Sequence, residues 1–136
     1  MTLVVLDASC MLAAFLPDEM VGGAADLVAR ALTEGAVVPA IWRLEVVNGA
    51  LQAHRRGRFD DGVLAALLGD FAKVAVAVDQ DGTASPWGDV ADLARRHHLS
   101  AYDASYLELA RRRGLPLATL DAKLRRVAGH ESVEVL

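Results

Sequence analysis

Four acidic residues occupy positions at which predicted strands end or predicted helices lie: Asp7, Glu45, Asp103 and Asp121. Asp7 follows the apolar run 3–6, and Asp121 follows the apolar run 117–120. In a parallel α/β sheet, the strand ends and the helix starts after them share one edge, where ligands bind. Carboxylates crowded at that edge raise each other's pKa unless a cation holds them together. Carboxylate oxygens suit Mg²⁺ or Mn²⁺, so this pattern indicates metal-dependent phosphate chemistry.

Each of the three aspartates also has a purely structural explanation. Asp7 and Asp121 each lie between a predicted strand and a predicted helix, where Asp is a favourable N-cap. Asp103 stands three residues after Ser100, which is the spacing of a capping box. For each aspartate taken alone, helix capping explains the residue at least as well as catalysis does.

Glu45 lies within a predicted helix and has no comparable structural role. The predicted buried stripe of that helix consists of Ile41, Leu44, Val47 and Leu51. Glu45 belongs to a polar stripe directly beside it, together with Asn48 and Gln52. A largely buried glutamate needs a partner. Because three strand-adjacent aspartates and a half-buried glutamate rarely occur together by chance, we expect the four to share a site.

The elements that must position these side chains alternate along the chain. Strands are predicted at 3–6, 36–38, 71–78 and 117–120, with a possible edge strand at 132–135. Helices are predicted at 9–16, 20–34, 39–56, 60–70, 85–97, 99–113 and 122–128. This alternation predicts a mostly parallel sheet covered on both faces. We therefore expect an α/β fold, a three-layer α/β/α sandwich formed by one domain over residues 1–136.

Composition restricts the compartment and the kind of partner. One cysteine, Cys10, excludes an internal disulfide and suits a reducing cytosol. No apolar run approaches the length of a membrane span, and the N-terminal segment reads as a strand rather than a signal peptide. We expect a cytoplasmic protein. The net charge of −4 argues against a general nucleic-acid coat protein, although basic clusters occur at 54–58, 95–98, 111–113 and 123–126.

Four ordered segments resemble the PIN domain, and within that superfamily the VapC toxins of toxin–antitoxin pairs. They are Val5 to Ser9, Pro39 to Asn48 with Glu45 at its seventh position, Tyr102 to Ala110, and Ala118 to Leu124. A short motif such as Asp-Ala-Ser is weak by itself. The set spans nearly the whole chain in the order and spacing of the family, and this makes the resemblance strong.

The resemblance implies a Mg²⁺- or Mn²⁺-dependent endoribonuclease. Asp7, Glu45, Asp103 and Asp121 match the acidic quartet of the family, and Ser9 matches its small hydroxyl residue beside the first Asp. Asn48 and Thr119 match positions that often carry supporting polar groups. Family members are usually homodimers and are inhibited by a small antitoxin, which here implies a VapB-type partner.

On that interpretation, Asp7, Asp103 and Asp121 hold a metal that activates water, and Glu45 binds a second ion or orients the water. Ser9 fixes a carboxylate or contacts the phosphate. Since water attacks, the products carry a 5′-phosphate and a 3′-hydroxyl. The predicted RNA contacts are Arg43, Arg55, Arg56, Arg95, Arg96, Arg111, Arg112 and Arg113. Each of these also suits a helix C-terminus, where the dipole favours cations. Trp42 and Trp87 are candidates for base stacking, although core packing is the more common role of such a residue.

Two alternatives remain open on sequence alone. One is a phosphatase with an Asp nucleophile, of the haloacid-dehalogenase type; it normally has a second Asp two residues after the first, where this chain has Ser9. The other is a catalytically silent RNA- or protein-binding module that retains the acidic pocket. The chain carries no Gly-rich phosphate loop, and Asp79 to Gly82 begins like an EF-hand loop without the rest of it.

Overall fold

The computed structural model describes residues 3–17, 22–81 and 86–136. Four short parallel strands form one sheet in the order β3-β2-β1-β4. Their bounds are β1 Val4–Leu6, β2 Ala36–Val38, β3 Val76–Val78 and β4 Leu117–Ala118. Strands β1, β2 and β4 are buried throughout, as expected for a parallel sheet that is covered on both faces.

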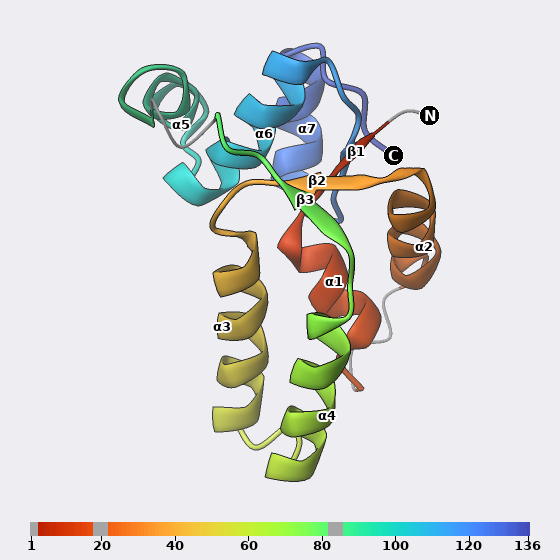
Figure 1. Ribbon diagram of the computed structural model, residues 1–136. Helices are drawn as coiled ribbons and strands as arrows, with labels where there is room; N and C mark the ends of the chain where they lie inside the picture. Colours follow the sequence, from red (N-terminus) through yellow and green to blue (C-terminus); the bar gives the residue numbers. More distant parts are fainter. Residues whose placement is uncertain (1–2, 18–21, 82–85) are drawn as a thin grey trace.

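Helices cover both faces of this sheet, as Figure 1 shows. On one side lie α1 Ala8–Phe15, α2 Ala24–Glu34, α3 Trp42–Arg55 and α4 Asp61–Ala72. On the other lie α5 Ala91–His97, α6 Ala101–Arg113 and α7 Ala122–His130, with the π-helical turn η2 Pro86–Val90 leading into α5. The predicted three-layer α/β/α sandwich is therefore confirmed.

The helix ends follow local sequence signals. Asp7, Asp60 and Asp121 cap the N-termini of α1, α4 and α7, and the Ser100 side chain caps α6. Gly35 and Gly114 end α2 and α6 with positive φ angles of 111° and 63°. A non-glycine side chain would be strained at such angles, which explains why both helices stop at glycine.

The strand predicted at 71–78 is correct in its second half, which contains β3, and wrong in its first half. Helix α4 continues to Ala72, because the ring of Phe71 packs edge-on against Phe15 at 5.4 Å between ring centroids. The segment belongs to a small apolar cluster around Leu16, Ala53 and Leu67, which joins the α3–α4 pair to α1. Tertiary packing thus decides the helix end here. Figure 1 shows the α3–α4 pair extending away from the sheet.

Other boundaries shift by smaller amounts. The predicted edge strand 132–135 reduces to a single parallel bridge between Val135 and Leu117. Helix α3 begins at Trp42 rather than Pro39. Met20 and Ser85, which we expected to begin helices, lie outside the described residues.

The predicted buried stripe of α3 is wrong. Leu44 is 72% exposed and Val47 is 37% exposed, whereas the buried positions are Trp42, Val46, Ala50 and Ala53. The helix is rotated relative to the expectation because Trp42 and Val46 pack into the main core beside the sheet. Glu45 is half-buried, as expected, but exposed apolar residues lie beside it on the outer side.

Candidate active site

The carboxyl ends of β1 and β4 form the centre of the site. β1 has β2 on one side and β4 on the other, so the order in which strands are added to the parallel sheet reverses at β1. Such a switch point leaves a crevice beyond the strand ends. Asp7 follows β1 and is 5% exposed, and Thr119 follows β4 and is fully buried. The backbone N–H of Asp7 donates to the carbonyl of Ala118 at 3.0 Å, which aligns these two strand ends.

A relay of hydrogen bonds fixes Asp7. Thr119 Oγ1 donates to Asp7 Oδ2 at 2.7 Å and accepts from the backbone N–H of Asp121 at 3.1 Å. Ser9 Oγ donates to the same Asp7 oxygen at 2.7 Å, while the Ser9 N–H donates to Oδ1 at 3.4 Å. Three donors thus hold one carboxylate in a single rotamer.

Glu45 reaches the site from α3 and Asp103 from α6. Tyr106 Oη donates to Glu45 Oε1 at 2.5 Å. Burial, followed by the charges of Asp7 and Asp103, raises the pKa of Glu45, and the Tyr106 hydrogen bond partly opposes this. Burial also raises the pKa of Asp103, as do the nearby charges of Asp7 and Asp121. The charge of Asp7 thus acts on both Glu45 and Asp103, and that of Asp121 acts on Asp103.

Two of the predicted site aspartates also serve as helix caps. Asp7 accepts from the Ser9 N–H at the start of α1, and Asp121 Oδ1 accepts from the Leu124 N–H at 2.8 Å. Asp103 does not itself cap a helix; its backbone N–H donates to Ser100 Oγ at 3.0 Å. Asn48 is exposed on α3, three residues after Glu45. The capping interpretation is therefore confirmed for Asp7 and Asp121, and the predicted site role is a separate question.

The donor set suits a hard divalent cation. Carboxylate and hydroxyl oxygens come from four separate elements. Burial and, after it, the charges of neighbouring carboxylates raise the pKa of Glu45 and Asp103, and a bound cation relieves repulsion of this kind. Within 3–17, 22–81 and 86–136, no three His, Cys, Asp or Glu side chains already converge as a coordinating group. The carboxyl groups thus lie too far apart to coordinate one ion as they stand, and a bound cation would draw them together.

Tyr106 is a site residue that the sequence did not reveal. It is fully buried, and its partner Glu45 is 61 positions away in the chain. Tyr106 lies three residues after Asp103 on α6. Residues at that spacing share a helix face, which is the only sequence signal that points to it.

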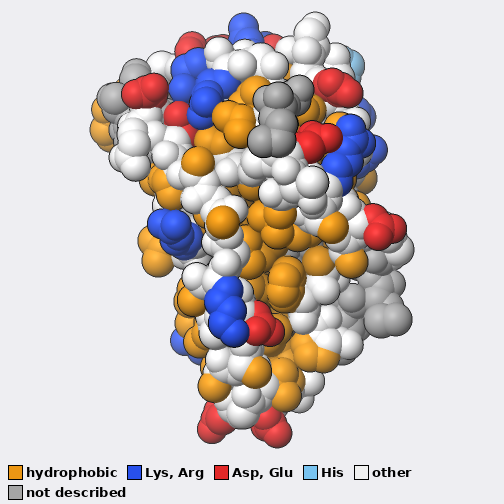
Figure 2. Space-filling view, turned by 45° about the vertical axis from the view of Figure 1, so that its right-hand side comes forward, with side chains coloured by type: hydrophobic (Ala, Val, Ile, Leu, Met, Phe, Trp, Pro, Cys, Tyr) orange, Lys and Arg blue, Asp and Glu red, His pale blue; other side chains and the backbone are white. Residues whose placement is uncertain are grey.

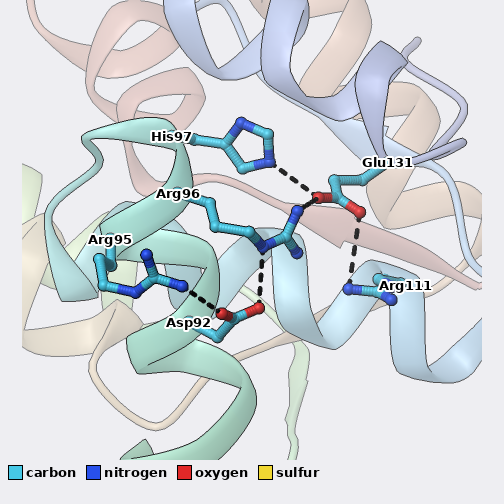
Figure 3. A network of polar contacts seen from close by, with 6 residues as sticks. All are labelled: Asp92, Arg95, Arg96, His97, Arg111 and Glu131. Atoms are coloured by element: carbon cyan, nitrogen blue, oxygen red, sulfur yellow. Dashed lines mark hydrogen bonds and ion pairs between the residues drawn. The ribbon is translucent and has the colours of Figure 1, made fainter.

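Most of the predicted RNA-contacting arginines on α5 and α6 engage acidic side chains of the protein, as Figure 3 shows for Arg95, Arg96 and Arg111. Arg95 and Arg96 pair with Asp92 at 3.1 and 2.8 Å. Arg96 also pairs with Glu131, at 2.8 Å, as do His97 at 2.7 Å and Arg111 at 3.5 Å. Glu131 therefore joins α5 and α6 to the end of α7.

The remaining predicted arginines and the two tryptophans differ in exposure. Arg112 pairs with Asp79 and Glu108, whereas Arg43, Arg55, Arg56 and Arg113 are exposed. Trp42 is 3% exposed, and its Nε1 has no hydrogen-bond partner among the described residues. Trp42 is thus a core residue, as the packing interpretation predicted. Trp87 is 88% exposed, so the expectation of a core-packing role is wrong for that residue.

Residues 4–130 match the family model of the PIN domain. The chain belongs to the PIN-domain family. A curated relative, ribonuclease VapC3 of Pyrobaculum aerophilum, is 30% identical over 120 residues, which are 88% of this chain and 90% of the relative. The resemblance to VapC-type proteins is thereby confirmed, and these comparisons give no support to the phosphatase alternative.

Solved structures show the same fold. PAE2754 of Pyrobaculum aerophilum superposes with a TM-score of 0.63 at 25% identity, covering 93% of this chain and 86% of that one. FitAcB of Neisseria gonorrhoeae superposes with a TM-score of 0.69 at 15% identity, covering 98% of this chain and 96% of that one. VapBC2 of Rickettsia felis, solved with a DNA fragment from its promoter, superposes with a TM-score of 0.66 at 11% identity. The match covers 99% of this chain and 98% of that one. None of the described helices has the length and apolar character that crossing a membrane requires.

Proposed function

We propose that this protein is a divalent-metal-dependent endoribonuclease, the toxin of a VapBC-type pair. The observation that carries the proposal is the open group of four carboxyls at the β1–β4 crevice, two of which have raised pKa values. Family membership and the VapC3 relative support ribonuclease as the activity.

Asp7, Asp103 and Asp121 are the residues that would hold Mg²⁺ or Mn²⁺, with Glu45 at the edge of the group. The bound cation would supply electrophilic assistance to the phosphate and a water of lowered pKa. Ser9 and Thr119 keep Asp7 in one rotamer, so that its free lone pairs face the crevice. Tyr106 orients Glu45 in the same way from the buried side.

The charge distribution explains why such a site would depend on a cation. The carboxyl groups would repel an RNA phosphate, and the arginines of α5 and α6 are largely balanced by Asp92, Glu131, Glu108 and Asp79. A phosphodiester would therefore approach this edge only after the acidic charge is offset.

The antitoxin proposal rests on the relatives. The VapC name of the curated relative points to a VapB-type partner, and surface apolar side chains give such a partner something to bind. Figure 2 shows hydrophobic side chains gathered across the middle of one face, and partly buried apolar residues there belong to elements such as α4 and β3. We also propose a homodimer, which is the usual state in the family.

The proposal is tested by RNA cleavage with Mn²⁺, with excess chelator, and with the variant Asp7→Asn. We expect cleavage to 5′-phosphate and 3′-hydroxyl ends that chelator and Asp7→Asn both abolish. Cleavage by Asp7→Asn would exclude the metal-site mechanism. A native chain that binds RNA and Mn²⁺ but cuts nothing would favour the silent binding module instead.

A further inference from the structure

A pocket of about 280 Å³ lies beside the carboxylate group. Most of its lining is apolar and comes from the β2–α3 connection, η2 and the first half of α6, with Ile41, Tyr102 and Leu109 among the residues. Three polar residues, Asp79, Ser105 and Glu108, also line it. None of the proposed catalytic residues lines this pocket, so it is a separate feature of the same edge.

Two walls of the pocket continue directly into the site. Tyr102 immediately precedes Asp103 at the start of α6. Ile41 stands four residues before Glu45 at the start of α3, a spacing that places both on one helix face. A nucleotide whose phosphate lies at the carboxylate group therefore has this pocket next to its ribose and base.

The polar groups of the pocket are mainly hydrogen-bond acceptors. Arg112 donates to Asp79 Oδ2 at 2.5 Å and to Glu108 Oε1 at 2.7 Å, which holds two buried carboxylates in place. Two carboxylates against one guanidinium leave a net negative charge, which disfavours a phosphate. Arg112 engages both oxygens of each carboxylate, and because a carboxylate oxygen has two lone pairs, such an oxygen can accept a second N–H group from an uncharged ring. Ser105 Oγ donates to the carbonyl of Tyr102 and retains its own acceptor capacity.

Exposed aromatic side chains flank the pocket. Tyr102 is 60% exposed, and Trp87, which follows the lining residue Pro86, is 88% exposed. Single-stranded RNA is commonly recognised by stacking unpaired bases on such rings. An apolar pocket with aromatic rims and N–H acceptors fits a base better than it fits a phosphate or a metal ion.

We propose that this pocket binds one unstacked nucleobase beside the scissile phosphate, with Tyr102 as its stacking platform and the Asp79–Glu108 pair accepting its N–H groups. The inference rests on the proposed ribonuclease function and specifies where the protein recognises a base of its RNA substrate.

The test measures binding separately from cleavage. Short single-stranded RNA hexamers, with or without one abasic position, are titrated by fluorescence anisotropy in Ca²⁺ against the native chain, Tyr102→Ala and the pocket-filling Ser105→Leu. Leu44→Ala is the matched control, because Leu44 is an exposed apolar residue that does not line the pocket. Circular dichroism establishes that each variant is folded.

We expect the native chain to bind an intact hexamer about tenfold more tightly than its abasic counterpart, which is within the range for stacking on an aromatic ring. Tyr102→Ala and Ser105→Leu should remove most of that preference and leave the affinity for the abasic strand unchanged. Leu44→Ala should retain it. A base preference that survives in both pocket variants would overturn the proposal.

Sedimentation velocity on the same variants separates a protein interface from a base site. If Tyr102→Ala and Leu44→Ala both dissociate a dimer while the base preference stays intact, the pocket is an interface between copies and the proposal fails. If base-dependent binding is found but no RNA is cleaved in Mn²⁺, the subsite stands and the proposed ribonuclease function fails. If RNA is cleaved in Mn²⁺ but no base preference is found, the proposed ribonuclease function stands and the proposed base subsite fails.

Discussion

Tyr106 Oη donates a hydrogen bond to Glu45 Oε1 over 2.5 Å, joining α6 to α3 beneath the carboxylate group. Burial raises the pKa of Tyr106, so the phenol remains protonated and acts as the donor. The bond holds a half-buried carboxylate that no residue near it in sequence could hold. It also opposes the effect of burial on the pKa of Glu45.

Removing that hydroxyl should change how the protein responds to pH. In Tyr106→Phe the pKa of Glu45 rises further, since the hydrogen bond that lowers it is lost. We expect the acid limb of the RNA-cleavage profile to move to higher pH and Mn²⁺ binding to weaken on that acid limb. Both are measured by initial rates and by calorimetric titration. An unchanged acid limb would mean that Glu45 does not titrate in the reaction.

Without metal, stability should fall as pH rises. Glu45 and Asp103 have folded-state pKa values above their ordinary values of 4.5 and 3.8. A carboxyl group of this kind contributes stability that is fully present below its unfolded pKa and is lost as pH rises through its folded pKa. In chelator, the melting temperature should therefore fall over that range, and Mg²⁺ should raise it more at the upper end.

Variants of Glu45 and Asp103 separate their contribution to the pH dependence of stability from that of the other ionisable groups. Glu45→Gln and Asp103→Asn should each flatten the pH dependence in chelator and reduce the Mg²⁺ effect. Asp92 and Glu131 have lowered pKa values, owing to hydrogen bonds from Arg96 and His97, so they act in the opposite direction. The Asp92 carboxyl is half exposed, so solvent screens its effect. Equal slopes in the native chain and both variants would refute the prediction.

Thr119 should contribute to both stability and activity. Thr119→Val keeps the shape of this buried side chain but removes the donor to Asp7 and the acceptor for the Asp121 N–H. Unpaired buried polar groups cost about 1–3 kcal/mol, which urea denaturation can measure. Ser9→Ala serves for comparison, because Ser9 is exposed and water can replace its hydroxyl. We expect the smaller stability loss there.

Asp121 allows capping to be separated from metal binding. Asparagine is as favourable an N-cap as aspartate, whereas alanine lacks the cap and costs about 1 kcal/mol. Asp121→Asn should therefore keep the native free energy of unfolding but weaken Mn²⁺ binding and cleavage. Asp121→Ala should lose both. If Asp121→Asn cleaves RNA at the native rate, Asp121 is a cap and nothing more.

Glu131 controls whether the arginines of α5 and α6 are available to RNA. In Glu131→Gln, Arg96 and Arg111 lose an acidic partner that is only 10% exposed. We expect tighter RNA binding with a steeper dependence on salt concentration, because released cations neutralise more phosphates. The melting temperature should fall, since the network also links α5, α6 and α7 (Figure 3). Unaltered salt dependence would place the RNA path elsewhere.

The sequence was most informative where the determinants are local. Strand β2 was predicted with its observed bounds, and the helices before Gly35 and Gly114 were predicted to end at 34 and 113, as they do. Strand hydrophobicity and positive φ at glycine depend on few neighbours, which explains this success. The rotation of α3 was missed since Leu44 and Val46 are both apolar, and only packing against the sheet decides which is buried. The boundary between α4 and β3 was missed for the same reason.

Chain order and the family resemblance singled out the acidic residues and Ser9, whose hydroxyl donates to Asp7, whereas other hydrogen bonds around them were harder to predict. Strand ends at Asp7 and Asp121 follow from chain order, so their proximity could be inferred before the fold was known. The relay through Thr119 was suggested only by family resemblance, and the Tyr106 bond was not foreseen. The pocket at Tyr102 could not be predicted, because its walls come from the β2–α3 connection, η2 and α6, which are far apart in sequence.

On the proposed function, Asp7 and Asp121 would be both helix caps and metal ligands, which affects how this chain can change over time. A substitution that disables either carboxylate also removes a helix cap, unless the new residue is one of the few that cap equally well. Loss of activity is then accompanied by loss of stability, so an inactive copy would tend to be cleared as a poorly folded protein rather than persist as an inert one. Asparagine at either position is the narrow route by which a folded, silent descendant of this protein could arise.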